Sequence, residues 1–396
     1  MLTEQRMAAL KFIDIIPVIN TSDRLRVLST LEEFRAIKSQ WDDLLCNSEV
    51  DCPFLRHEWL VNWWECFGAG AALHIVLWEA NNRLLGGAPL MQTRRKIFGI
   101  PVRTFEFLAN GHSYRSGIVV ESKRRSQFLY HLYRYFQEWR RKWSLLWLRD
   151  IPEGAGIIEF FSQPPGDSHI SLECPMASPY VCLEGTWKEY WLGRSAHFRA
   201  NLRRREKNLS QFGKITFKAY DGCEHVARML PVGLELEASG WKGRAGSAIL
   251  KSSETISFYS RIANWAAENG WLRLYFLFLE DKAIAFDLAL DYAGRIYLLK
   301  IGHDENHSRF SPGQLLRMRT LEAAFASGCR EYDFLGFDMP WKMEWTTDVR
   351  VHRTVVIYGR GPLPKALYMW QQRLLPTIRK SQKLQVALRS LRRSEK

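Results

Sequence analysis

One order of segments occurs twice along this chain of 396 residues: a helix with one apolar side, a hairpin of two apolar strands, and a further apolar strand. Laying Leu73 over Leu272 aligns the two hairpins without a gap, so that the turn Asn81-Asn82-Arg83 falls on Glu280-Asp281-Lys282. A pattern that recurs in one order is typical of repeated structural units. The sequence therefore predicts an α/β (α+β) fold of two tandem modules, each a mixed twisted sheet flanked by helices.

The predicted modules occupy most of the chain. We expect the first over residues 25–165 and the second over 180–360, with a proline-containing connection at 151–180. Residues 362–396 alternate apolar and basic positions, which predicts a basic amphipathic tail. Its first part is expected to pack on the body, and peripheral contact with an anionic membrane is the alternative.

The overall composition limits the class of protein. Lysine and arginine number 56 against 42 acidic residues, a net charge of +14 that favours phosphorylated cofactors, nucleic acid or anionic lipid as partners. A hydrophobic content of 46% excludes an intrinsically disordered chain. The seven cysteines are scattered without a C-x-x-C pair, and no run of about 20 apolar residues occurs. We expect a cytoplasmic protein without a disulfide framework.

The stretch "RFSPGQLLRMRTLEAAFASGCREYDFLG" predicts a loop, a helix and a strand in quick succession. Pro312 suits the first turn of a helix, and Gly313 lets a ligand approach the backbone. A helix N-terminus after a small-residue turn can bind an anion, because its first backbone N–H groups lack partners. The alternative is that Ser311 only caps the helix.

The run "HFRANLRRREKNL…ELEASGWKGRAGSAI…YLLKIGHDENHSRFSPGQLL…GCREYDFLG…WKMEW" resembles the CelD-type, or cellulose-biosynthesis-like, branch of the GNAT acyltransferase superfamily. The resemblance covers about residues 25–360 and is clearest from His197 to Trp345. Its most distinctive element is "GWKGRAGSAI". It implies two GNAT-like modules and an acyltransferase that uses acetyl-CoA or another acyl-CoA as donor.

In GNAT enzymes the amides of such a loop bind the pyrophosphate of coenzyme A, and the resemblance places this role on Ser311, Gly313, Gln314 and Leu315. The usual loop has the form Q/R-x-x-G-x-G/A, whereas this chain keeps one glycine only. Fem-type transferases are distantly similar, also contain two such modules, and take their acyl group from tRNA. The donor therefore has two candidates, acyl-CoA and aminoacyl-tRNA.

Direct acyl transfer needs a group that removes a proton from the acceptor. Asp304 and His303 follow the strand "IYLLKIG", and Asp287 lies within the apolar strand "IAFDLAL", so these three residues are the catalytic candidates. The alternative for Asp287 is an ion pair with an arginine. The run "HDENH" also suggests a metal site, but a third and a fourth ligand are lacking nearby, so we expect no metal.

Two further runs supply candidate substrate-binding residues. Trp241 and Lys242 stand in "GWKGRAGSAI", where an ordered loop over the ligand and a surface loop anchored by the tryptophan are equal alternatives. Asp333 and Lys342 follow the next strand, at the end of the sheet where α/β proteins usually bind ligands. Structural pairing of Lys342 with a nearby carboxylate is the alternative.

Three functions follow. The resemblance implies acetyl transfer to a hydroxyl or an amine of a sugar or polysaccharide precursor, with the donor site in the second module. A Fem-like transferase would place the basic helix at 197–209 beside the donor cleft, although exposed aromatics typical of nucleic-acid binding are scarce there. A non-catalytic module of a polysaccharide-producing complex would have its loop amides blocked. We expect the first module to have lost its donor site and to shape the acceptor cleft.

Overall fold

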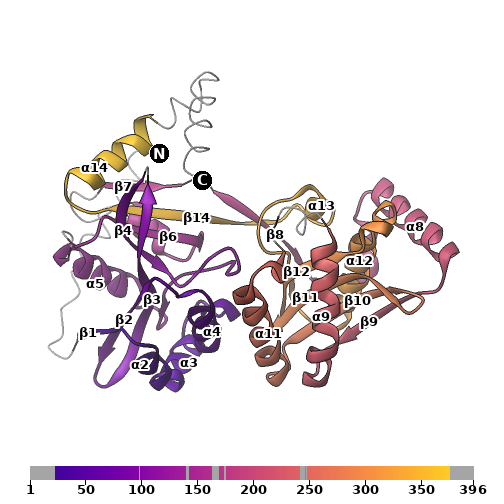
Figure 1. Cartoon of the computed structure of the whole chain (residues 1–396), viewed down its shortest axis with the longest axis horizontal. Helices are drawn as coiled ribbons and strands as arrows, with labels where there is room; N and C mark the ends of the chain where they lie inside the picture. Colours follow the sequence, from indigo (N-terminus) through magenta and orange to yellow (C-terminus); the bar gives the residue numbers. More distant parts are fainter. Residues whose placement is uncertain are drawn as a thin grey trace.

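The computed structural model describes residues 23–97, 99–139, 142–162, 169–173, 175–240, 246 and 248–374. Its strands form one mixed sheet in the order β1-β2-β3-β4-β6-β14-β8-β13-β12-β11-β10-β9, with β5 beside β3 and β7 beside β14 (Figure 1). Helices flank this sheet along its length. The predicted α/β class is confirmed.

We call residues 24–172 and 349–374 the N-terminal half. Its strands and helices are β1 (Arg24–Leu28), α2 (Leu31–Ala36), α3 (Lys38–Cys46), α4 (His57–Phe67), β2 (Ala72–Ala80), β3 (Arg83–Ile97), β4 (Ile100–Phe107), β5 (Val119–Val120), α5 (Arg125–Glu138), β6 (Leu145–Pro152), α6 (Ile157–Ser162), β7 (His169–Leu172), β14 (Val349–Tyr358) and α14 (Pro362–Met369).

We call residues 176–345 the C-terminal half. Its strands and helices are β8 (Met176–Cys182), α7 (Trp187–Leu192), α8 (Ala196–Leu209), β9 (Ile215–Tyr220), α9 (Cys223–Ser239), α11 (Ser253–Glu268), β10 (Leu272–Leu279), β11 (Lys282–Tyr292), β12 (Arg295–His303), α12 (Pro312–Ala326), β13 (Glu331–Asp333) and α13 (Pro340–Met343).

Both predicted hairpins are present. In the N-terminal half Asn81 and Asn82 connect β2 to β3 with φ angles of 51° and 61°, the left-handed conformation that asparagine tolerates in tight hairpin turns. In the C-terminal half Glu280, with a φ of 50°, begins the turn from β10 to β11. The two hairpins therefore lie in corresponding places of the two halves.

Strand β8 joins the two halves into one sheet. Its residues 176–179 pair with β14, and its residues 180–182 pair with β13. Strand β14 lies at the end of the predicted second module, yet it pairs with β6 and β7 of the N-terminal half. The two halves therefore meet at the pair β14 and β8, so neither strand leaves an unpaired edge at the junction. The module boundaries inferred from the sequence stay a prediction.

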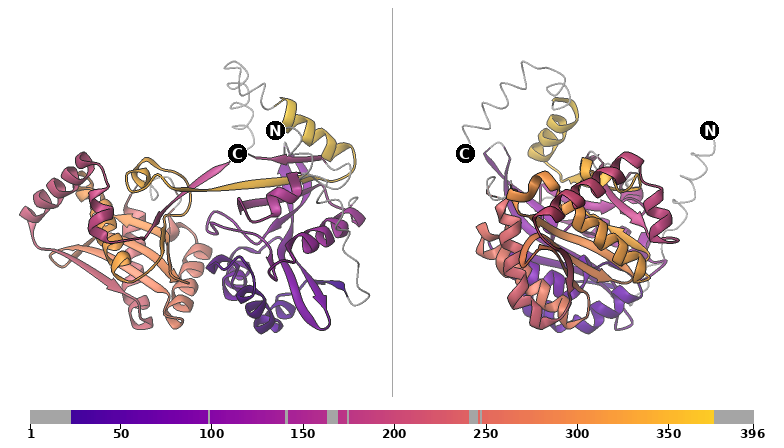
Figure 2. Two further views of the ribbon diagram at one scale, coloured as in Figure 1. Left: turned by 180° about the vertical axis from the view of Figure 1, so that it is seen from behind. Right: turned by 90° about the vertical axis from the view of Figure 1, so that its right-hand side faces the viewer.

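An apolar core continues from one half into the other. Helix α4 packs against α11, and the rings of Trp59 and Phe258 meet edge to face with their centroids 5.3 Å apart. Figures 1 and 2 show the two halves side by side, with these helices facing each other between them. Residues of α4, α9 and α11 belong to one buried cluster. Burial of this shared surface fixes how the two halves meet.

Helix signals in the sequence agree with the observed ends. Thr186 begins α7 through a capping box with Glu189. Residues 187–209 form two α-helices rather than one, because Ser195 starts α8 with a second cap. Phe198, Leu202 and Leu209 bury one side of α8, so its arginines lie mainly on the outer side.

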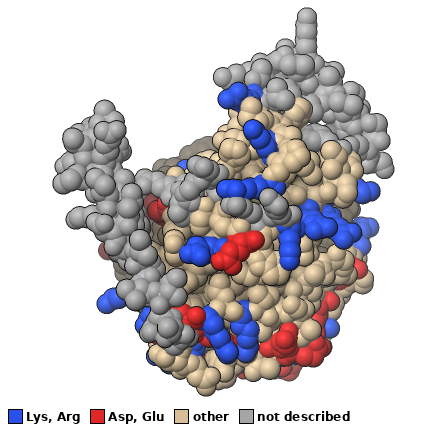
Figure 3. Space-filling model, turned by 90° about the vertical axis from the view of Figure 1, so that its left-hand side faces the viewer, with Lys and Arg blue, Asp and Glu red and all other residues tan. Residues whose placement is uncertain are grey.

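Basic residues also gather on the N-terminal half. Figure 3 shows Lys and Arg over the upper part of the face that the N-terminal half presents. On the β3–β4 hairpin, Arg94 lies directly opposite Arg103, and both are exposed. Only the first part of the predicted tail, helix α14, lies within the described residues, and Leu363 and Leu367 pack on the body there. Among the described helices, none is long and apolar enough to cross a membrane.

Candidate active site

Strands β12 and β13 create an opening in the sheet of the C-terminal half. They are parallel, but they pair only from Arg295 with Glu331 to Tyr297 with Asp333. Beyond this point β12 continues to His303. The segment that follows β13 turns away from β12 at Leu335, whose φ of 53° is left-handed. The backbone groups that face each other here are no longer paired across the strands, so a ligand can enter between them.

A cavity of about 430 Å³ fills this opening and extends to the N-terminal half. Its size is that of a small-molecule site. Residues 298–303 of β12 form one wall, and residues 334–342 form another. The N-terminal half contributes Asn110, Ser113, Tyr114 and Asp150. The polar loop "HSYRSG" therefore borders the site, and the Tyr114 hydroxyl donates to the Leu299 carbonyl across the two halves at 2.8 Å.

Lys300 is the cationic residue on the β12 wall. Its ammonium lies 5.2 Å from the ring centroid of Tyr259 and 5.8 Å from that of Tyr114. Burial lowers the pKa of Lys300 to about 8, although Glu237 favours the charged form. Within the described ranges no carboxylate lies at ion-pair distance from this ammonium.

Asp150 lies in β6, two residues before the strand ends at Pro152, and lines the same cavity. Its φ of 56° is unusual for a residue other than glycine and costs free energy, which is a feature found at functional sites. Burial raises the pKa of the Asp150 carboxyl, and Arg149 opposes this effect. A carboxyl with a raised pKa that faces a cavity is suited to accept a proton near neutral pH.

The sequence of the C-terminal half matches a known family at this site. Residues 196–343 match the family model described as "Acetyltransferase (GNAT) domain". These residues form a GNAT acetyltransferase domain. The chain is therefore an acyltransferase, and β12, α12 and β13, which border the opening, all belong to this GNAT domain.

The structure of FemX shares the fold over both halves, and two further solved structures show weaker similarity. The structure of FemX has a TM-score of 0.55 at 12% sequence identity, over 87% of this chain and 99% of that one. The C-terminal domain of a putative lysylphosphatidylglycerol synthetase from Agrobacterium fabrum gives 0.49 at 10%, over 85% and 95%. A tandem GNAT protein from the clavulanic acid biosynthesis pathway gives 0.46 at 13%, over 86% and 99%. No curated protein is significantly similar in sequence to this chain.

The predicted donor loop lies at the N-terminus of α12 in the GNAT domain. Ser311 has a left-handed φ of 50°, and its N–H donates to the Ser308 carbonyl at 2.9 Å. The amides of Gln314 and Leu315 both donate to the Ser311 carbonyl, at 2.9 and 3.2 Å. A Cβ added at Gly313 would have no atom within 4 Å, so the space in front of this residue is open. Of the predicted amides in this described segment, that of Gly313 is the one without a backbone acceptor.

The Gln314 side chain connects the donor loop to the cavity. Its amide nitrogen donates to the Trp341 carbonyl at 3.2 Å, and its oxygen accepts from the indole of Trp345 at 2.7 Å. Trp341 itself lines the cavity. Gln314 therefore orders the helix start rather than presenting its side chain to a ligand.

Asp304 and His303 follow β12 as predicted. His303 lines the cavity, whereas the Asp304 carboxylate accepts hydrogen bonds from Lys282, from the Asn306 amide and from His307. Burial alone would raise the pKa of Asp304, but these donors lower it below its usual value. The contacts make Asp304 a cap of the turn Glu305–Phe310, and its role as a base stays a prediction.

Asp287 is buried on the face of the sheet that α12 covers. Its carboxylate is bonded to Arg317 at 2.8 Å, and both side chains are 1% exposed. Burial raises the pKa of Asp287 to about 6 despite the arginine. These contacts are those of the ion pair with an arginine that the sequence offered as the alternative. A catalytic role for Asp287 stays a prediction.

Lys342 lies on the cavity wall opposite β12, and Asp333, the last residue of β13, comes directly before that wall without lining the cavity. Asp333 is fully buried and bonded to Arg115 and Arg350, while its other oxygen accepts from the Leu335 amide at 2.8 Å. The Lys342 ammonium donates to the carbonyls of Leu335 and Phe337, and burial lowers its pKa to about 8. These contacts hold the 334–337 turn, so Lys342 reaches the cavity but already has partners.

Trp241 and Lys242 lie outside the described residues. Among the described neighbours, the Glu237 carboxylate, buried near the end of α9, accepts from the Ile249 amide at 3.0 Å. Both Glu237 and Gly240 line the cavity.

Lys300 and Asp150 were not among the candidate residues of the sequence. A single lysine in the apolar strand "IYLLKIG" was a usable signal, because a charged group inside an apolar strand is costly without a purpose. Asp150 gave less of a signal, since it lies near the end of a strand and its left-handed backbone is not visible in the sequence. Among the described residues no group of His, Cys, Asp and Glu could hold a metal ion.

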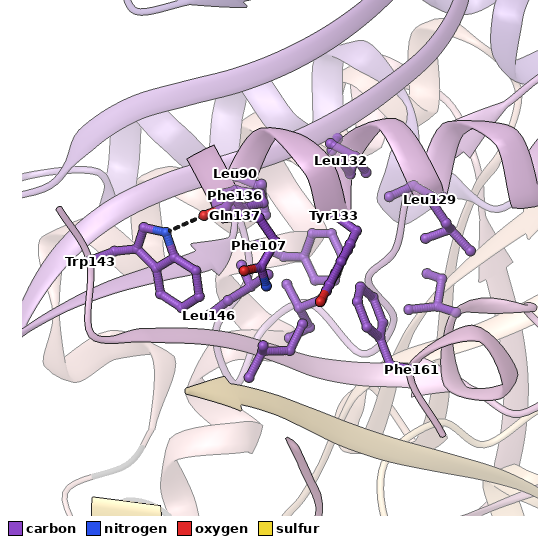
Figure 4. A pocket seen from close by; sticks show the side chains of 15 residues that line it. Leu90, Phe107, Leu129, Leu132, Tyr133, Phe136, Gln137, Trp143, Leu146 and Phe161 are labelled. Atoms are coloured by element: carbon purple, nitrogen blue, oxygen red, sulfur yellow. Dashed lines mark hydrogen bonds between the residues drawn. The ribbon is translucent and has the colours of Figure 1, made fainter. Parts of the chain in front are cut away.

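A small void lies between α5 and the sheet of the N-terminal half. It measures about 20 Å³ and is lined mainly by apolar side chains, among them Phe107, Phe136 and Leu146 (Figure 4). The Trp143 indole there donates to the Phe136 carbonyl at 3.0 Å. A void of this size holds about one water molecule at most, and apolar walls tend to keep it dry.

Proposed function

We propose that this chain transfers an acyl group from acyl-CoA, with acetyl-CoA as the expected donor, directly to a hydroxyl or an amine of an acceptor. The observation that carries the proposal is the cavity between β12 and the chain beyond β13, which lies within the GNAT domain and reaches the N-terminal half. The donor enters from the α12 side and the acceptor from the N-terminal half. Transfer without a covalent intermediate requires only that the two meet here in the correct orientation.

The start of α12 supports donor binding. The Gly313 amide and the open space around Gly313 leave room for a phosphate at the positive end of a helix of 15 residues. The residues Ser311, Gln314 and Leu315 then shape the turn, because their amides already have backbone acceptors. The proposed donor site therefore uses one backbone amide, that of Gly313, where the sequence predicted four residues.

Asp150 is the proposed proton acceptor of the reaction. It faces the cavity from the N-terminal half, and its raised pKa favours proton uptake from an acceptor amine or hydroxyl. His303, at the opposite wall, is the candidate from the GNAT domain. The residues of the N-terminal half that line the cavity support its proposed role in shaping the acceptor cleft, and the CelD-type resemblance adds a sugar or polysaccharide precursor as the expected acceptor.

A Fem-like transferase that uses aminoacyl-tRNA is the second candidate. Helix α8 contacts both α12 and the turn Glu305–Phe310 that leads into it, so the basic helix lies beside the predicted donor loop. Arg203 and Arg204 are exposed there. The shared fold with FemX agrees with this candidate, but at 12% identity it carries no information on the donor.

Titration calorimetry with acetyl-CoA tests the proposal. We expect wild-type protein to bind, Gly313→Glu to lose binding, and Gly313→Gln, which adds the same bulk without the charge, to be weakened less. Gly313 tolerates these changes because no atom lies within 4 Å of an added Cβ. A wild-type protein that binds no acyl-CoA would contradict the proposal.

Two further outcomes separate the alternatives. Binding of aminoacyl-tRNA that is lost in the double variant Arg203→Glu, Arg204→Glu would favour the Fem-like donor. Binding of neither donor would favour a non-catalytic module. Once an acceptor is found, Asp150→Asn is expected to lower the rate by about 100-fold or more without changing the affinity for acetyl-CoA.

A further inference from the structure

Lys300 stands out among the charged groups at the cavity because no carboxylate of the described residues lies at ion-pair distance from it, and the charge of Glu237 acts on it only from further away. The charged and titratable groups around it have other partners: Glu237 bonds the Ile249 amide, and Lys342 bonds two carbonyls. His112 bonds the Tyr259 hydroxyl at 3.0 Å, and burial together with Lys300 lowers its pKa to about 4, so it is neutral at pH 7. Asp150 and His303 share the cavity but form no ion pair with Lys300.

Two tyrosine rings hold the Lys300 ammonium in place. Their centroids lie 5.2 and 5.8 Å from it, which is within the range in which an aromatic face favours a cation. Tyr114 is anchored to the Leu299 carbonyl, and Tyr259 is anchored to His112. The surroundings therefore orient a positive charge at the cavity and leave the position next to it open to the negative charge of a ligand.

We propose that Lys300 binds an anionic group, a carboxylate or a phosphate, of the acceptor. This inference rests on the proposed function and specifies its acceptor as an anionic molecule. A half-buried cation without a direct ion-pair partner is costly, and an anion that enters the cavity and contacts it would reduce that cost.

The position of Lys300 assigns the anion to the acceptor rather than to the donor. Lys300 pairs with Leu288 across β11 and β12, and Leu288 packs with α9 and α11 on one face of the sheet. Helix α12 covers the opposite face, where Arg317 bonds Asp287. The start of α12, which is the proposed phosphate site of the donor, therefore belongs to the other face.

Anion binding must be coupled to proton uptake. Burial lowers the pKa of Lys300 to about 8, so part of the free protein carries a neutral amine at slightly alkaline pH. A bound anion stabilises the ammonium and raises the pKa again, by about one unit or more for a close contact. A lysine that only fills space would titrate identically with and without anions.

NMR of protein labelled at the lysine ε-carbons tests this coupling. The Lys300 signal, assigned by its loss in Lys300→Arg, is titrated with pH in chloride alone, with acetate and with inorganic phosphate. We expect its pKa to rise with one of these anions, which also tells a carboxylate site from a phosphate site. Lys282, whose ammonium already bonds Asp304, serves as the internal control and should not respond.

The opposite results overturn the inference. A Lys300 pKa that neither acetate nor phosphate changes means that the cavity holds no anion there. A pKa that only coenzyme A raises means that Lys300 belongs to the donor site. Acetyl-CoA titration of Lys300→Met separates this failure from that of the proposed function, because we expect the variant to keep its donor affinity.

Discussion

Arg115 and Asp333 form a buried ion pair between the two halves of the molecule, although 218 residues separate them in the sequence. The arginine side chain is 7% exposed and the carboxylate 0%. Arg350 donates to the same carboxylate at 3.0 Å from β14. Three segments of the chain thus meet at one carboxylate next to the cavity, so the ion pair fixes the wall from which Lys342 and the 334–337 turn project.

Asp333→Asn should destabilise the whole fold. The substitution leaves the buried Arg115 without a negative partner, whereas Arg350 keeps its ion pair with Glu331 at 2.8 Å, and we expect the free energy of unfolding to fall by about 3–5 kcal/mol. Urea denaturation measures the change. Glu138→Gln, which breaks an exposed pair with Arg134, is the matched control and should cost less than about 1 kcal/mol. Equal effects of the two substitutions would contradict a structural role for the buried pair.

Gly302→Ala should disturb the cavity wall. A Cβ on Gly302 would overlap the Glu237 amide nitrogen and lie 2.7 Å from the Glu237 Cα, so β12 and α9 must move apart. We expect a loss of about 1–3 kcal/mol in the free energy of unfolding, measured by urea denaturation. Gly313→Ala, with open space around the added carbon, should leave stability unchanged or slightly raised. A Gly302→Ala protein as stable as wild type would show that the two elements are not in close contact.

Stability should decrease as the pH falls below neutrality, in part because of His352. This residue is 1% exposed, and neither ring nitrogen has a hydrogen-bond partner among the described residues. Burial, with Arg115 and Arg350 nearby, lowers its pKa from 6.5 to about 4, while Asp333 opposes the shift. Between these values the unfolded chain binds a proton that the folded chain does not, so folding becomes less favourable as pH falls.

The contribution of His352 can be isolated by substitution. Its shift corresponds to a loss on the order of 3 kcal/mol between pH 7 and pH 4. His352→Gln removes this titration, so its free energy of unfolding should depend less on pH than that of wild type over the same range. Identical pH profiles for the two proteins would mean that His352 protonates equally in both states.

The basic tail should bind anionic membranes if the predicted peripheral contact occurs. Residues 375–396 carry seven lysines and arginines, each worth about 1 kcal/mol near an anionic surface. Sedimentation with vesicles of phosphatidylglycerol and phosphatidylcholine should recover the full chain but not a chain that ends at Leu374. Phosphatidylcholine vesicles alone are the control. Equal binding of the two chains would assign any membrane contact to another surface, such as Arg94 and Arg103 of the β3–β4 hairpin.

Local features of the molecule could be predicted from the sequence because neighbouring residues decide them. The turns at Asn81-Asn82 and Glu280-Asp281, the cap at Thr186 and the helix after Pro312 depend on side chains within a few positions of one another. Hydrophobic periodicity likewise places strands and helices without reference to distant contacts. The repeated order of these elements was enough to predict the α/β class, which the structure confirms.

The predicted acids show where such reasoning ends. A carboxylate in an apolar strand, such as Asp287, has the same sequence signature whether it reacts or forms an ion pair. Arg317, which settles its contacts, lies 30 residues further along the chain. Asp304 is similar, since Lys282 reaches it from a neighbouring strand.

The sequence by itself determined the elements, their order and the presence of a GNAT-type acyltransferase segment, because these depend on local patterns and on motif similarity. Only the tertiary structure decided that β14 returns to the N-terminal half, that Arg115 meets Asp333, and that Asp150 and Lys300 face one cavity. The physical reason is that long-range strand pairing and the burial of shared apolar surface bring together residues that no local pattern connects. The chemistry of the site depends on these distant pairs.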